Sequence, residues 1–462
     1  MDPALSLAVV AGRLTAATVR RLGRGGGTTL PGRVSAALDG RVVEKLGARL
    51  TQGSLLVTGT NGKTTTASLL RSLTAAAGHR VVANRAGANL VSGLASALVQ
   101  DGGRSSAPAE IGVFEVDEAV LPAAVEALVP RVVVVTNLFR DQLDRYGELE
   151  SSAAAIGSGL AALPGASHVI LCGDDPAVAW LGRDLRAQVH YYGLVDPDQG
   201  SPTLPYAADA RFCPGCGQPF DFHRVYVGHL GEYSCPTGDF RRPDLDLRAD
   251  HVEFAGLERQ ALTVSGLGLN RAVLEVPLSG LYNAYNILAA TGAALMAGVP
   301  ESAIAPALSS FSPAFGRLER VSVEGRTVHL MLAKNPAGFN EVLRASRLLG
   351  GARNYIVAVN DRIADGRDIS WIWDVDFELL AAADHVVLTG DRALDMRIRL
   401  KYGGLAPERM TVADTPAAAV DQALALVPAG EELFVLPTYT AMLDLRAELV
   451  RRGYLAPFWE AA

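Results

Sequence analysis

The sequence predicts an α/β protein with a central nucleotide-binding domain, a small ribbon-like insertion and a second α/β domain at the C-terminal end. Near-continuous apolar runs, such as residues 132–135, alternate with helical stretches, which is typical of a parallel sheet covered by helices on both faces. A glycine-rich turn at 59–64 joins an apolar run to a helical stretch, as a phosphate-binding loop requires. A new alternating series begins near residue 319, and its length of roughly 140 residues is a normal domain size, so we expect a Rossmann-like α/β domain there.

The chain is too long for a single hydrophobic core, because 462 residues imply several domains. We expect an N-terminal lead-in at 1–50, a central domain at 51–318 with an insertion at about 206–245, and a C-terminal domain at 319–462. The formal net charge of −7 argues against a general nucleic-acid binder, so no nucleic-acid partner is expected. The sequence contains no run of about 20 apolar residues, so we predict no membrane-spanning helix and a cytoplasmic protein.

The first 50 residues carry two helical patterns, at 5–22 and at 34–46, separated by a glycine-rich break. Such a lead-in is locally positive because of four arginines, Arg20, Arg21, Arg24 and Arg33. Charges of this kind most often form a solvated face. The alternative is contact with an anionic ligand or with a membrane surface, which leaves open a peripheral location at the inner face of the membrane.

The glycine-rich turn reads Gly-Thr-Asn-Gly-Lys-Thr. Its glycines let backbone N–H groups approach phosphate oxygens, Lys63 adds a mobile positive charge, and the Thr64 hydroxyl is suited to magnesium. The full phosphate-loop pattern has a glycine where this chain has Val57, so the loop is a shorter variant. The predicted nucleotide-binding residues of this stretch are Gly59, Thr60, Asn61, Gly62, Lys63, Thr64 and Thr65.

Acidic side chains lie at the end of the apolar run 111–116, where a parallel sheet gathers its ligands. Glu115 is the first of them, followed by Asp117 and Glu118. We expect Glu115 and Thr64 to hold magnesium ions that bridge the phosphates of ATP. A role of Glu115 as a simple cap is the alternative.

Three of the four cysteines cluster in the insertion, which indicates metal binding rather than a disulfide scaffold. Cys213 and Cys216 form a Cys-x-x-Cys knuckle, and Cys235 opens a second knuckle at the spacing of a zinc ribbon. Gly238 stands where the fourth cysteine would be, so loss of the metal is the alternative. The candidates for a fourth zinc ligand are Asp239, His223 and His229.

Two further groups of polar residues are candidates for the site. Asn283 and Asn286 begin an alanine-rich helical stretch and share one helix face, where they are either caps or readers of an adenine edge. In the C-terminal domain, Lys334, Asn335 and Asp361 follow apolar runs, in the usual place for a site shared across a domain cleft.

These motifs occur in the order seen in the Mur ligases, the ATP-dependent amide-forming enzymes of peptidoglycan synthesis, and the resemblance covers nearly the whole chain. The cysteine insertion and the stretch from Ala364 to Asp374 resemble one branch of that family, the MurT synthetase subunits of lipid II isoglutaminyl synthases. The other matching positions are 59–64, Glu115, Asn137, Tyr282 with Asn283 and Asn286, Gly316-Arg317 with Glu319, and Lys334-Asn335-Pro336.

The resemblance implies a Mur-ligase-like fold and a reaction. ATP phosphorylates the α-carboxylate of the D-glutamate at position two of the lipid II stem peptide, and ammonia then displaces phosphate to give D-isoglutamine. The ammonia is expected from a GatD-like glutamine amidotransferase subunit that forms a heterodimer with this chain, and lipid II is expected at the membrane surface. ATP and magnesium are the implied cofactors, and zinc is a further candidate.

Roles for single residues follow from the same resemblance. Lys63 is implied to contact the phosphates, Thr64 and Glu115 to bind magnesium, and Asn283 and Asn286 to approach adenine.

Other implied roles concern the acyl phosphate and the partner. Arg317 and Lys334 would steady phosphate or the acyl phosphate, although a surface ion pair is the alternative for Arg317. One acidic residue would complete the partner's Cys-His pair, and capping of the turn at Gly366 is the alternative for all the candidates. The candidates are Asp361, Asp365 and Asp368.

Two other functions stay open on the sequence. A Mur-type ligase that adds an amino acid or glutamate, as folylpolyglutamate synthetases do, would need no glutamine-hydrolysing partner. A zinc-ribbon ATPase that binds nucleic acid would belong to another class, and the acidic net charge and the lack of interleaved aromatic and basic residues weigh against it.

Overall fold

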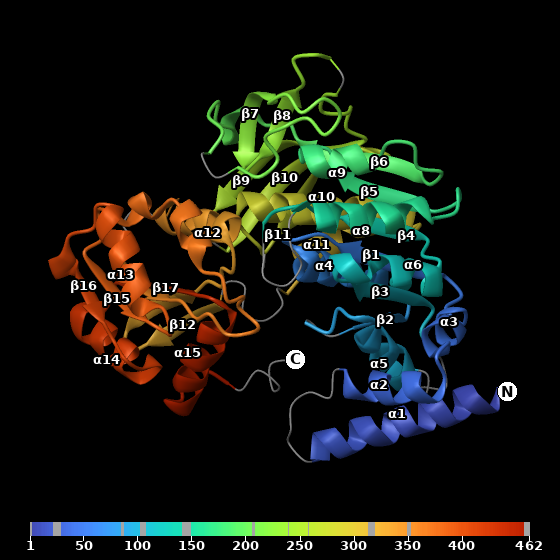
Figure 1. The fold of residues 1–462 in the computed structure, drawn as a ribbon, viewed down its shortest axis with the longest axis horizontal. Helices are drawn as coiled ribbons and strands as arrows, with labels where there is room; N and C mark the ends of the chain where they lie inside the picture. Colours follow the sequence, from blue (N-terminus) through green and yellow to red (C-terminus); the bar gives the residue numbers. More distant parts are fainter. Residues whose placement is uncertain are drawn as a thin grey trace. The chain divides into compact units, whose positions relative to one another are not determined.

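A computed structural model of the chain shows two compact units, each described here by itself (Figure 1). The larger unit comprises Met1–Phe139, Leu149–Leu204 and Ala210–Ser312, and the smaller unit comprises Arg140–Glu148, Pro205–Asp209 and Pro313–Ala462. The structure describes residues 2–21, 29–84, 87–101, 108–140, 149–205, 208–238, 240–256, 258–312, 319–348 and 353–456.

The larger unit is built on a nine-stranded sheet with the order β11-β10-β9-β6-β5-β4-β1-β3-β2. Its strands from β2 across to β9 run parallel, as predicted, and β9, β10 and β11 continue the sheet in antiparallel fashion. The strands are β1 Ser54–Thr58, β2 Val81–Ala83, β3 Ile111–Glu115, β4 Val132–Val135, β5 His168–Cys172, β6 Gln188–Leu194, β9 Leu247–Ala255, β10 Arg259–Gly266 and β11 Leu269–Val276.

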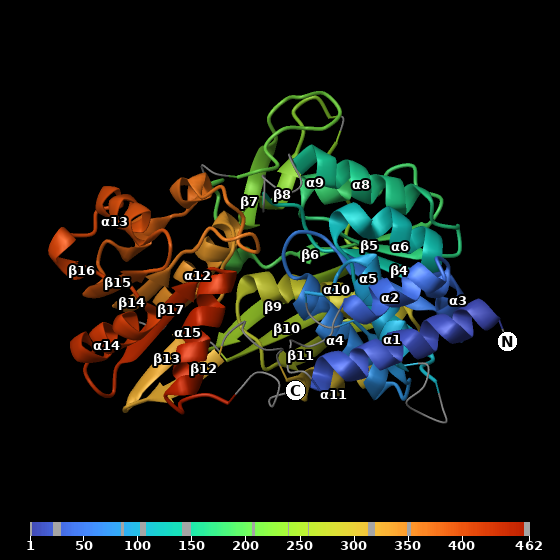
Figure 2. The same cartoon turned by 60° about the horizontal axis from the view of Figure 1, so that its bottom comes forward.

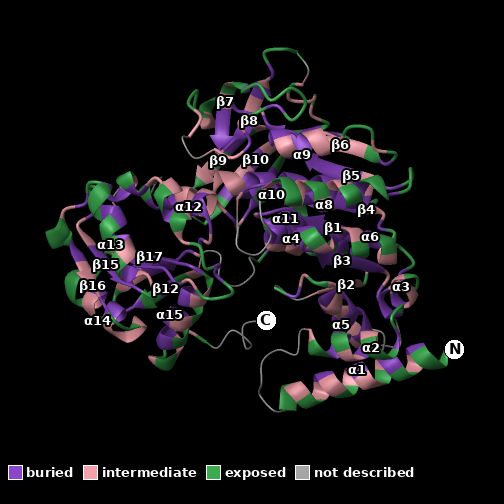
Figure 3. Cartoon of the chain, in the orientation of Figure 1, coloured by how far each residue is buried: buried purple, intermediate pink, exposed green. Residues whose placement is uncertain are grey.

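Helices cover this sheet, and one of them, α10 (Leu281–Met296), is buried along most of its length (Figure 3). Its alanine-rich sequence lets it pack closely against α4 and against β4, β5, β6 and β9. The other helices of the unit after β1 are α4 Lys63–Ala76, α5 Val91–Asp101, α6 Leu121–Leu128, α8 Leu149–Ala161, α9 Pro176–Leu181 and α11 Glu301–Ser309, with short 3₁₀ turns at Glu118–Val120 and Pro197–Gln199.

The N-terminal segment contributes three helices to the larger unit, α1 Pro3–Arg21, α2 Leu30–Leu38 and α3 Val42–Gly47 (Figure 2). Ser35 Oγ donates to the Ala8 carbonyl at 2.9 Å, so α1 and α2 approach closely. The prediction of one helix over 34–46 is wrong, because Asp39 ends α2 in an extended conformation and accepts a hydrogen bond from the Arg41 N–H at 3.0 Å. None of the described helices is long and apolar enough to cross a membrane.

The insertion forms a separate antiparallel pair, β7 Asp221–Val227 and β8 Leu230–Ser234. Two of its cysteines, Cys213 and Cys235, are buried in a small core with Phe220 and Tyr233. Tyr233 Oη donates to the Gly173 carbonyl at 3.2 Å, which fastens the pair to the end of β5.

The smaller unit contains a six-stranded sheet with the order β12-β13-β17-β14-β15-β16, and only β12 pairs antiparallel. This confirms the predicted C-terminal α/β sheet and adds β12 and β16, which were not predicted. Its strands are β12 Glu319–Val323, β13 Arg326–Leu330, β14 Asn354–Ala358, β15 His385–Thr389, β16 Met410–Val412 and β17 Glu432–Pro437. Its helices are α12 Pro336–Leu348, α13 Ala393–Tyr402, α14 Pro416–Leu426 and α15 Tyr439–Arg451, with 3₁₀ turns at Ser370–Asp374, Phe377–Leu380 and Pro407–Arg409.

Candidate nucleotide-binding and amidation site

The glycine-rich turn has the predicted strand–turn–helix geometry, because β1 ends at Thr58 and α4 begins at Lys63. Gly59 and Gly62 have φ angles of +116° and +85°, where a side chain would be strained. A Cβ on Gly59 would lie 2.4 Å from Thr136 Oγ1, and a Cβ on Gly62 would lie 2.0 Å from Asn286 Oδ1. Both positions therefore require glycine, and the backbone stays open to an anionic ligand at the start of α4.

The segment after β4 holds this loop in place. Thr60 N–H donates to the Asn137 carbonyl at 2.8 Å, and Asn61 N–H donates to Asn137 Oδ1 at 2.9 Å. The Thr60 hydroxyl exchanges hydrogen bonds with the backbone of Phe139, at 3.0 Å from its N–H and 3.1 Å to its carbonyl. Asn137 was noted as a polar residue that follows the apolar run 132–135 and as part of the family pattern, and its contacts give it a positioning role for the loop.

Lys63 is buried and lies folded over its own loop. Its ammonium donates to the Gly59 carbonyl at 2.5 Å and to the Thr60 carbonyl at 3.2 Å, and it pairs with Glu118 Oε1 at 3.0 Å. Glu118 was not among the predicted site residues, although its position three residues after Glu115 was a usable signal. The pair keeps the lysine charge at the loop, where a phosphate group can exchange for the carboxylate.

Glu115 and Thr64 follow from two neighbouring strands, because β3 ends at Glu115 and the adjacent β1 leads through the loop into α4, whose second residue is Thr64. Glu115 is the last residue of β3 and stands in register with Val57 of β1, two residues before the loop. Asn84 fixes the Glu115 backbone by bonding both its N–H and its carbonyl, at 2.9 Å and 2.8 Å. A carboxylate and a hydroxyl are hard oxygen donors of the kind magnesium prefers, so the residues present fit the predicted magnesium site.

The two asparagines of α10 form a connected pair beside the loop, which agrees with the predicted shared helix face. Asn286 Nδ2 donates to Asn283 Oδ1 at 3.0 Å, and Asn283 Nδ2 donates to the Ser279 carbonyl at 2.7 Å. Asn286 Oδ1 accepts from the Thr66 hydroxyl of α4 at 3.3 Å. These bonds join α10 to the phosphate-loop helix, while adenine recognition by the pair stays a prediction.

The three clustered cysteines come together in space. The ligand atoms of Cys213, Cys216 and Cys235 lie within 4.8 Å of one another, and within the described part of the chain no histidine or carboxylate joins them. Thr237 Oγ1 lies 3.4 Å from Cys216 Sγ and 3.0 Å from Cys235 Sγ. The hydrogen bond from Thr237 favours the thiolate and lowers the pKa of Cys235 to about 7, which suits a metal ligand.

The other zinc candidates lie elsewhere. His223 Nε2 bonds the Ser234 hydroxyl at 3.0 Å on the exposed side of the β7–β8 pair. His229 is fully buried against the Phe139 ring. Asp239 lies outside the described residues, as does Arg317, one of the predicted nucleotide-binding residues.

The three candidate aspartates of the smaller unit have different surroundings. Asp361 accepts two hydrogen bonds from the Arg392 guanidinium, at 3.0 Å and 2.7 Å. Asp365 is buried and caps α15 by bonding both the N–H and the hydroxyl of Thr440. Asp368 is exposed. The structure therefore separates three residues that the sequence could not rank.

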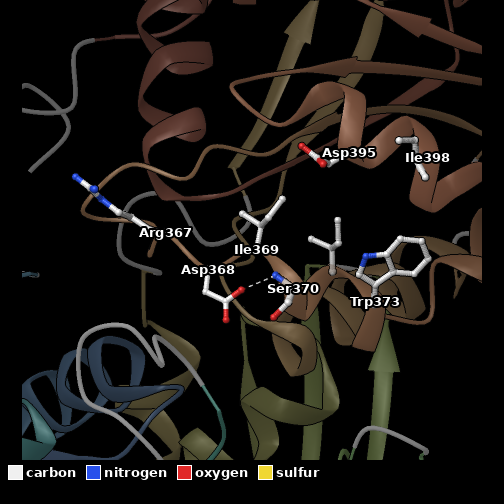
Figure 4. A pocket seen from close by; sticks show the side chains of 8 residues that line it. Arg367, Asp368, Ile369, Ser370, Trp373, Asp395 and Ile398 are labelled. Carbon is white, nitrogen blue, oxygen red and sulfur yellow. Dashed lines mark hydrogen bonds between the residues drawn. The ribbon is translucent and has the colours of Figure 1, made fainter.

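Asp368 lines a pocket of the smaller unit (Figure 4). Ser370 N–H donates to Asp368 Oδ1 at 2.8 Å, and this bond lowers the pKa of the carboxyl. The pocket also contains the apolar side chains of Ile369, Trp373 and Ile398. Asp368 is thus an ionised hydrogen-bond acceptor in the lining of a partly apolar pocket.

Lys334, the fourth predicted catalytic residue, follows β13 in the smaller unit and is half-buried. It precedes Asn335, which is buried and begins α12 by accepting the Gly338 N–H at 2.9 Å. The role of Lys334 in steadying phosphate stays a prediction.

Comparison with known proteins adds to this geometry. The profile of the Mur ligase middle domain matches residues 57–204, and that of the MurT ligase C-terminal domain matches residues 332–442. The lipid II isoglutaminyl synthase (glutamine-hydrolysing) subunit MurT of Streptococcus pneumoniae R6 is 31% identical over 457 residues, which cover 98% of each chain. The chain belongs to the MurT family of Mur ligases. The MurT subunit of Staphylococcus aureus N315 is also 31% identical, over 86% of this chain and 87% of that protein.

Solved structures of relatives of the MurT family show the same fold. The folylpolyglutamate synthase of Mycobacterium tuberculosis, solved in complex with ADP and AMPPCP, superposes with a TM-score of 0.64. The superposition covers 96% of this chain and all of that one at 17% sequence identity, so it bears on the fold alone. The predicted Mur-ligase-like architecture is confirmed, whereas the predicted zinc ribbon stays a prediction.

Proposed function

We propose that this MurT-family chain is the synthetase subunit of a lipid II isoglutaminyl synthase. It would use ATP to amidate the α-carboxylate of the D-glutamate in the lipid II stem peptide, giving D-isoglutamine for peptidoglycan. The observation that supports this most is the phosphate loop with its buried Lys63, set in a chain that matches a MurT subunit over 98% of its length. A carboxylate is a poor electrophile, so a loop that handles ATP next to acidic magnesium ligands fits carboxylate activation.

The proposed reaction has two steps. A carboxylate oxygen of the glutamate attacks the γ-phosphorus of ATP, and ADP leaves. Ammonia then attacks the acyl carbon, phosphate leaves with its bonding electron pair, and the proton that the nitrogen loses is taken up by the departing phosphate. Lys63 would release Glu118, bind the phosphate oxygens and stabilise the negative charge of the phosphoryl group during its transfer. Thr64 and Glu115 would hold magnesium, which supplies further charge neutralisation.

The ammonia would come from a glutaminase partner of the GatD type. Among the three candidate aspartates, Asp368 suits the partner's Cys-His pair best, because it is exposed and ionised whereas Asp365 is buried in a helix cap and Asp361 is paired with Arg392. An aspartate that orients a catalytic histidine must be ionised and within reach of it.

The surface around Asp368 supports a protein partner. Several large apolar side chains are exposed in the same part of the smaller unit, and the Trp373 and Tyr402 rings lie 6.0 Å apart. Exposed apolar side chains beside a pocket that contains an ionised carboxylate are typical of a protein interface. These side chains are Trp373, in the 3₁₀ turn Ser370–Asp374, and Leu394, Ile398 and Tyr402, on the helix α13 that contacts this turn.

A ligase that adds an amino acid is the alternative within the fold. Such an enzyme would work without a glutaminase and would accept an amino acid in place of ammonia. The decisive experiment co-expresses this chain with a glutamine amidotransferase of the GatD type and measures the conversion of lipid II to its amidated form with glutamine. Amide formation only with both subunits is expected, and joining of an amino acid by the single chain would contradict the proposal.

The cysteine cluster is proposed to hold one structural zinc ion through three thiolates, with Thr237 next to the remaining coordination position. We expect the purified chain to contain about one zinc per molecule by elemental analysis. Cys216→Ser should lose it, because one of three thiolates disappears, whereas His223→Ala should retain it. A wild-type chain that takes up no zinc at micromolar concentration would contradict this proposal.

Helix α1 is proposed to bring the enzyme to the membrane that holds its lipid substrate. Leu7, Val10 and Leu14 lie on one face and are 59%, 53% and 65% exposed, and no charged residue lies between Pro3 and Gly12. The last turn is basic and exposed, which suits anionic lipid headgroups. Insertion of only three apolar side chains into the membrane, together with two positive charges at its surface, favours weak, reversible binding.

Vesicle sedimentation tests this membrane surface. We expect binding to vesicles that contain phosphatidylglycerol, less binding to phosphatidylcholine alone, and loss of binding when Leu7, Val10 and Leu14 are all replaced by serine. Val273→Ser, at a similarly exposed apolar position on β11, is the control and should bind as the wild type does. Equal binding of the triple variant would remove α1 from the proposal.

A further inference from the structure

The insertion that carries the cysteines also touches the nucleotide site through its hairpin turn. Gly228, between β7 and β8, has a φ of +59°, and a Cβ there would lie 2.6 Å from the Phe139 ring. The next residue, His229, is fully buried, and its ring centroid lies 4.4 Å from that of Phe139. The turn therefore packs directly on the segment that follows β4.

His229 faces a carboxylate in this position. Its Nε2 lies 3.4 Å from Asp175 Oδ2, and among the described residues neither ring nitrogen has a hydrogen-bond partner. A buried polar group without a partner is costly, and an apolar ring would fill the same space without that cost. A histidine at this site therefore indicates that one of its ring nitrogens has a role, and in the described part of the chain Asp175 is the only carboxylate within ion-pair distance of it.

Asp175 and Phe139 both belong to chains of contacts that end at the phosphate loop. Asp175 Oδ2 accepts the Leu138 N–H at 2.8 Å, so the same oxygen that faces His229 holds the backbone after β4. The next residue, Phe139, exchanges two hydrogen bonds with the Thr60 hydroxyl of the loop. Two routes of contact therefore connect the hairpin turn with the phosphate loop. One is polar and passes through Asp175, and the other is the contact of the His229 ring with the Phe139 ring.

We propose that His229 is a positioning residue for the phosphate loop, and that the cysteine-bearing insertion supports nucleotide binding through it. The imidazole Nε2, 3.4 Å from Asp175 Oδ2, adds a polar contact to the backbone N–H groups that hold this carboxylate, and the ring packs on Phe139 beside the loop. The insertion is itself anchored to the segment after β5 that contains Asp175, because the Gly231 N–H donates to the Asp174 carbonyl at 2.8 Å. This inference rests on one part of the proposed function, namely that the phosphate loop is the ATP-binding site.

The test measures binding of Mg-ADP to the purified chain by calorimetry, together with the melting temperature. His229→Phe keeps a ring of similar size and removes the nitrogen that faces Asp175, and we expect about tenfold weaker binding, the size expected when a buried carboxylate loses one close polar contact. His229→Gln places an amide N–H near the Nε2 position and should restore the affinity. His223→Phe, on the exposed side of the same hairpin, should bind as the wild type does.

A purely structural role for His229 would lower the melting temperature in the Phe variant without a specific loss of affinity in the folded fraction. If His229→Phe does not fold, His229→Asn replaces it, because its shorter side chain does not reach Asp175, and the same weakening is expected. Wild-type affinity in the Phe or Asn variant overturns the inference. Lys63→Ala separates this failure from that of the proposed function, because unchanged Mg-ADP binding in that variant would mean that the loop is not the nucleotide site.

Discussion

Replacing Lys63 by alanine is expected to abolish glutamine-dependent amidation of lipid II, by about 10³-fold or more, and to weaken nucleotide binding strongly. The side chain is the buried cation of the loop, held by the Gly59 carbonyl and by Glu118. Without it, the charge that develops on the transferred phosphoryl group loses its nearest compensating cation, and loss of a single stabilising donor in a preorganised site already costs two to three orders of magnitude. Steady-state assays with both subunits, with ATP varied, measure the effect.

The matched control is Arg71→Ala, which removes an exposed cation from the same helix, α4, at a position away from the loop. It should retain wild-type activity. Lys63→Ala also leaves Glu118 buried without its cation, so its melting temperature must be compared with that of a Lys63→Ala/Glu118→Gln double variant. Unchanged turnover in a folded Lys63→Ala enzyme would contradict the assignment of this loop to ATP.

Replacing Asp368 by asparagine is expected to stop amidation with glutamine as nitrogen source and to leave amidation with added ammonium salts near the wild-type level. The ionised carboxylate is proposed to orient the histidine of the partner's Cys-His pair, and an amide cannot stabilise the imidazolium that forms there. Loss of such an aspartate costs about 10⁴-fold in hydrolases built on the same principle. The two nitrogen sources, assayed side by side with the assembled complex, distinguish this role from one in ATP chemistry.

The other two aspartates provide the controls for Asp368. Asp361→Asn keeps an acceptor for Arg392 and should retain glutamine-dependent activity. Asp365→Ala removes a buried carboxylate that caps α15 and should act first on the stability of the smaller unit, by about 1 kcal/mol, the usual cost of a lost cap. Loss of the glutamine-dependent reaction in the folded Asp361 or Asp365 variant, with a fully active Asp368→Asn enzyme, would reassign the role.

Local chemistry explains why the phosphate loop could be predicted from the sequence. The apolar run, two glycines and the Lys-Thr pair lie within a dozen residues, and each needs only its neighbours to be understood. The same holds for Asn283 and Asn286, because helical spacing alone puts them on one face, where they bond each other at 3.0 Å.

The features that could not be predicted from the sequence depend on contacts between segments that are distant along the chain. The bond of Glu118 to Lys63 and that of Asn137 to Asn61 depend on which strands are neighbours, and no local pattern specifies this. His229 was a candidate zinc ligand because it is near the cysteines in sequence, yet the hairpin turn places it against Phe139. The strands β9–β11 were missed for a related reason, since their half-exposed alternation becomes informative only once it is known that the parallel part of the sheet ends at β9.

The contact between Gly62 and Asn286 has a consequence for the order in which the protein can mature during synthesis. Asn286, which also bonds Thr66, is made 220 residues after that threonine. At 5 to 20 residues per second, a ribosome needs roughly 10 to 45 seconds to pass from one to the other. During that interval the nascent loop lacks the helix that closes over it, so ATP binding would report that translation has passed α10 and that the larger unit has assembled.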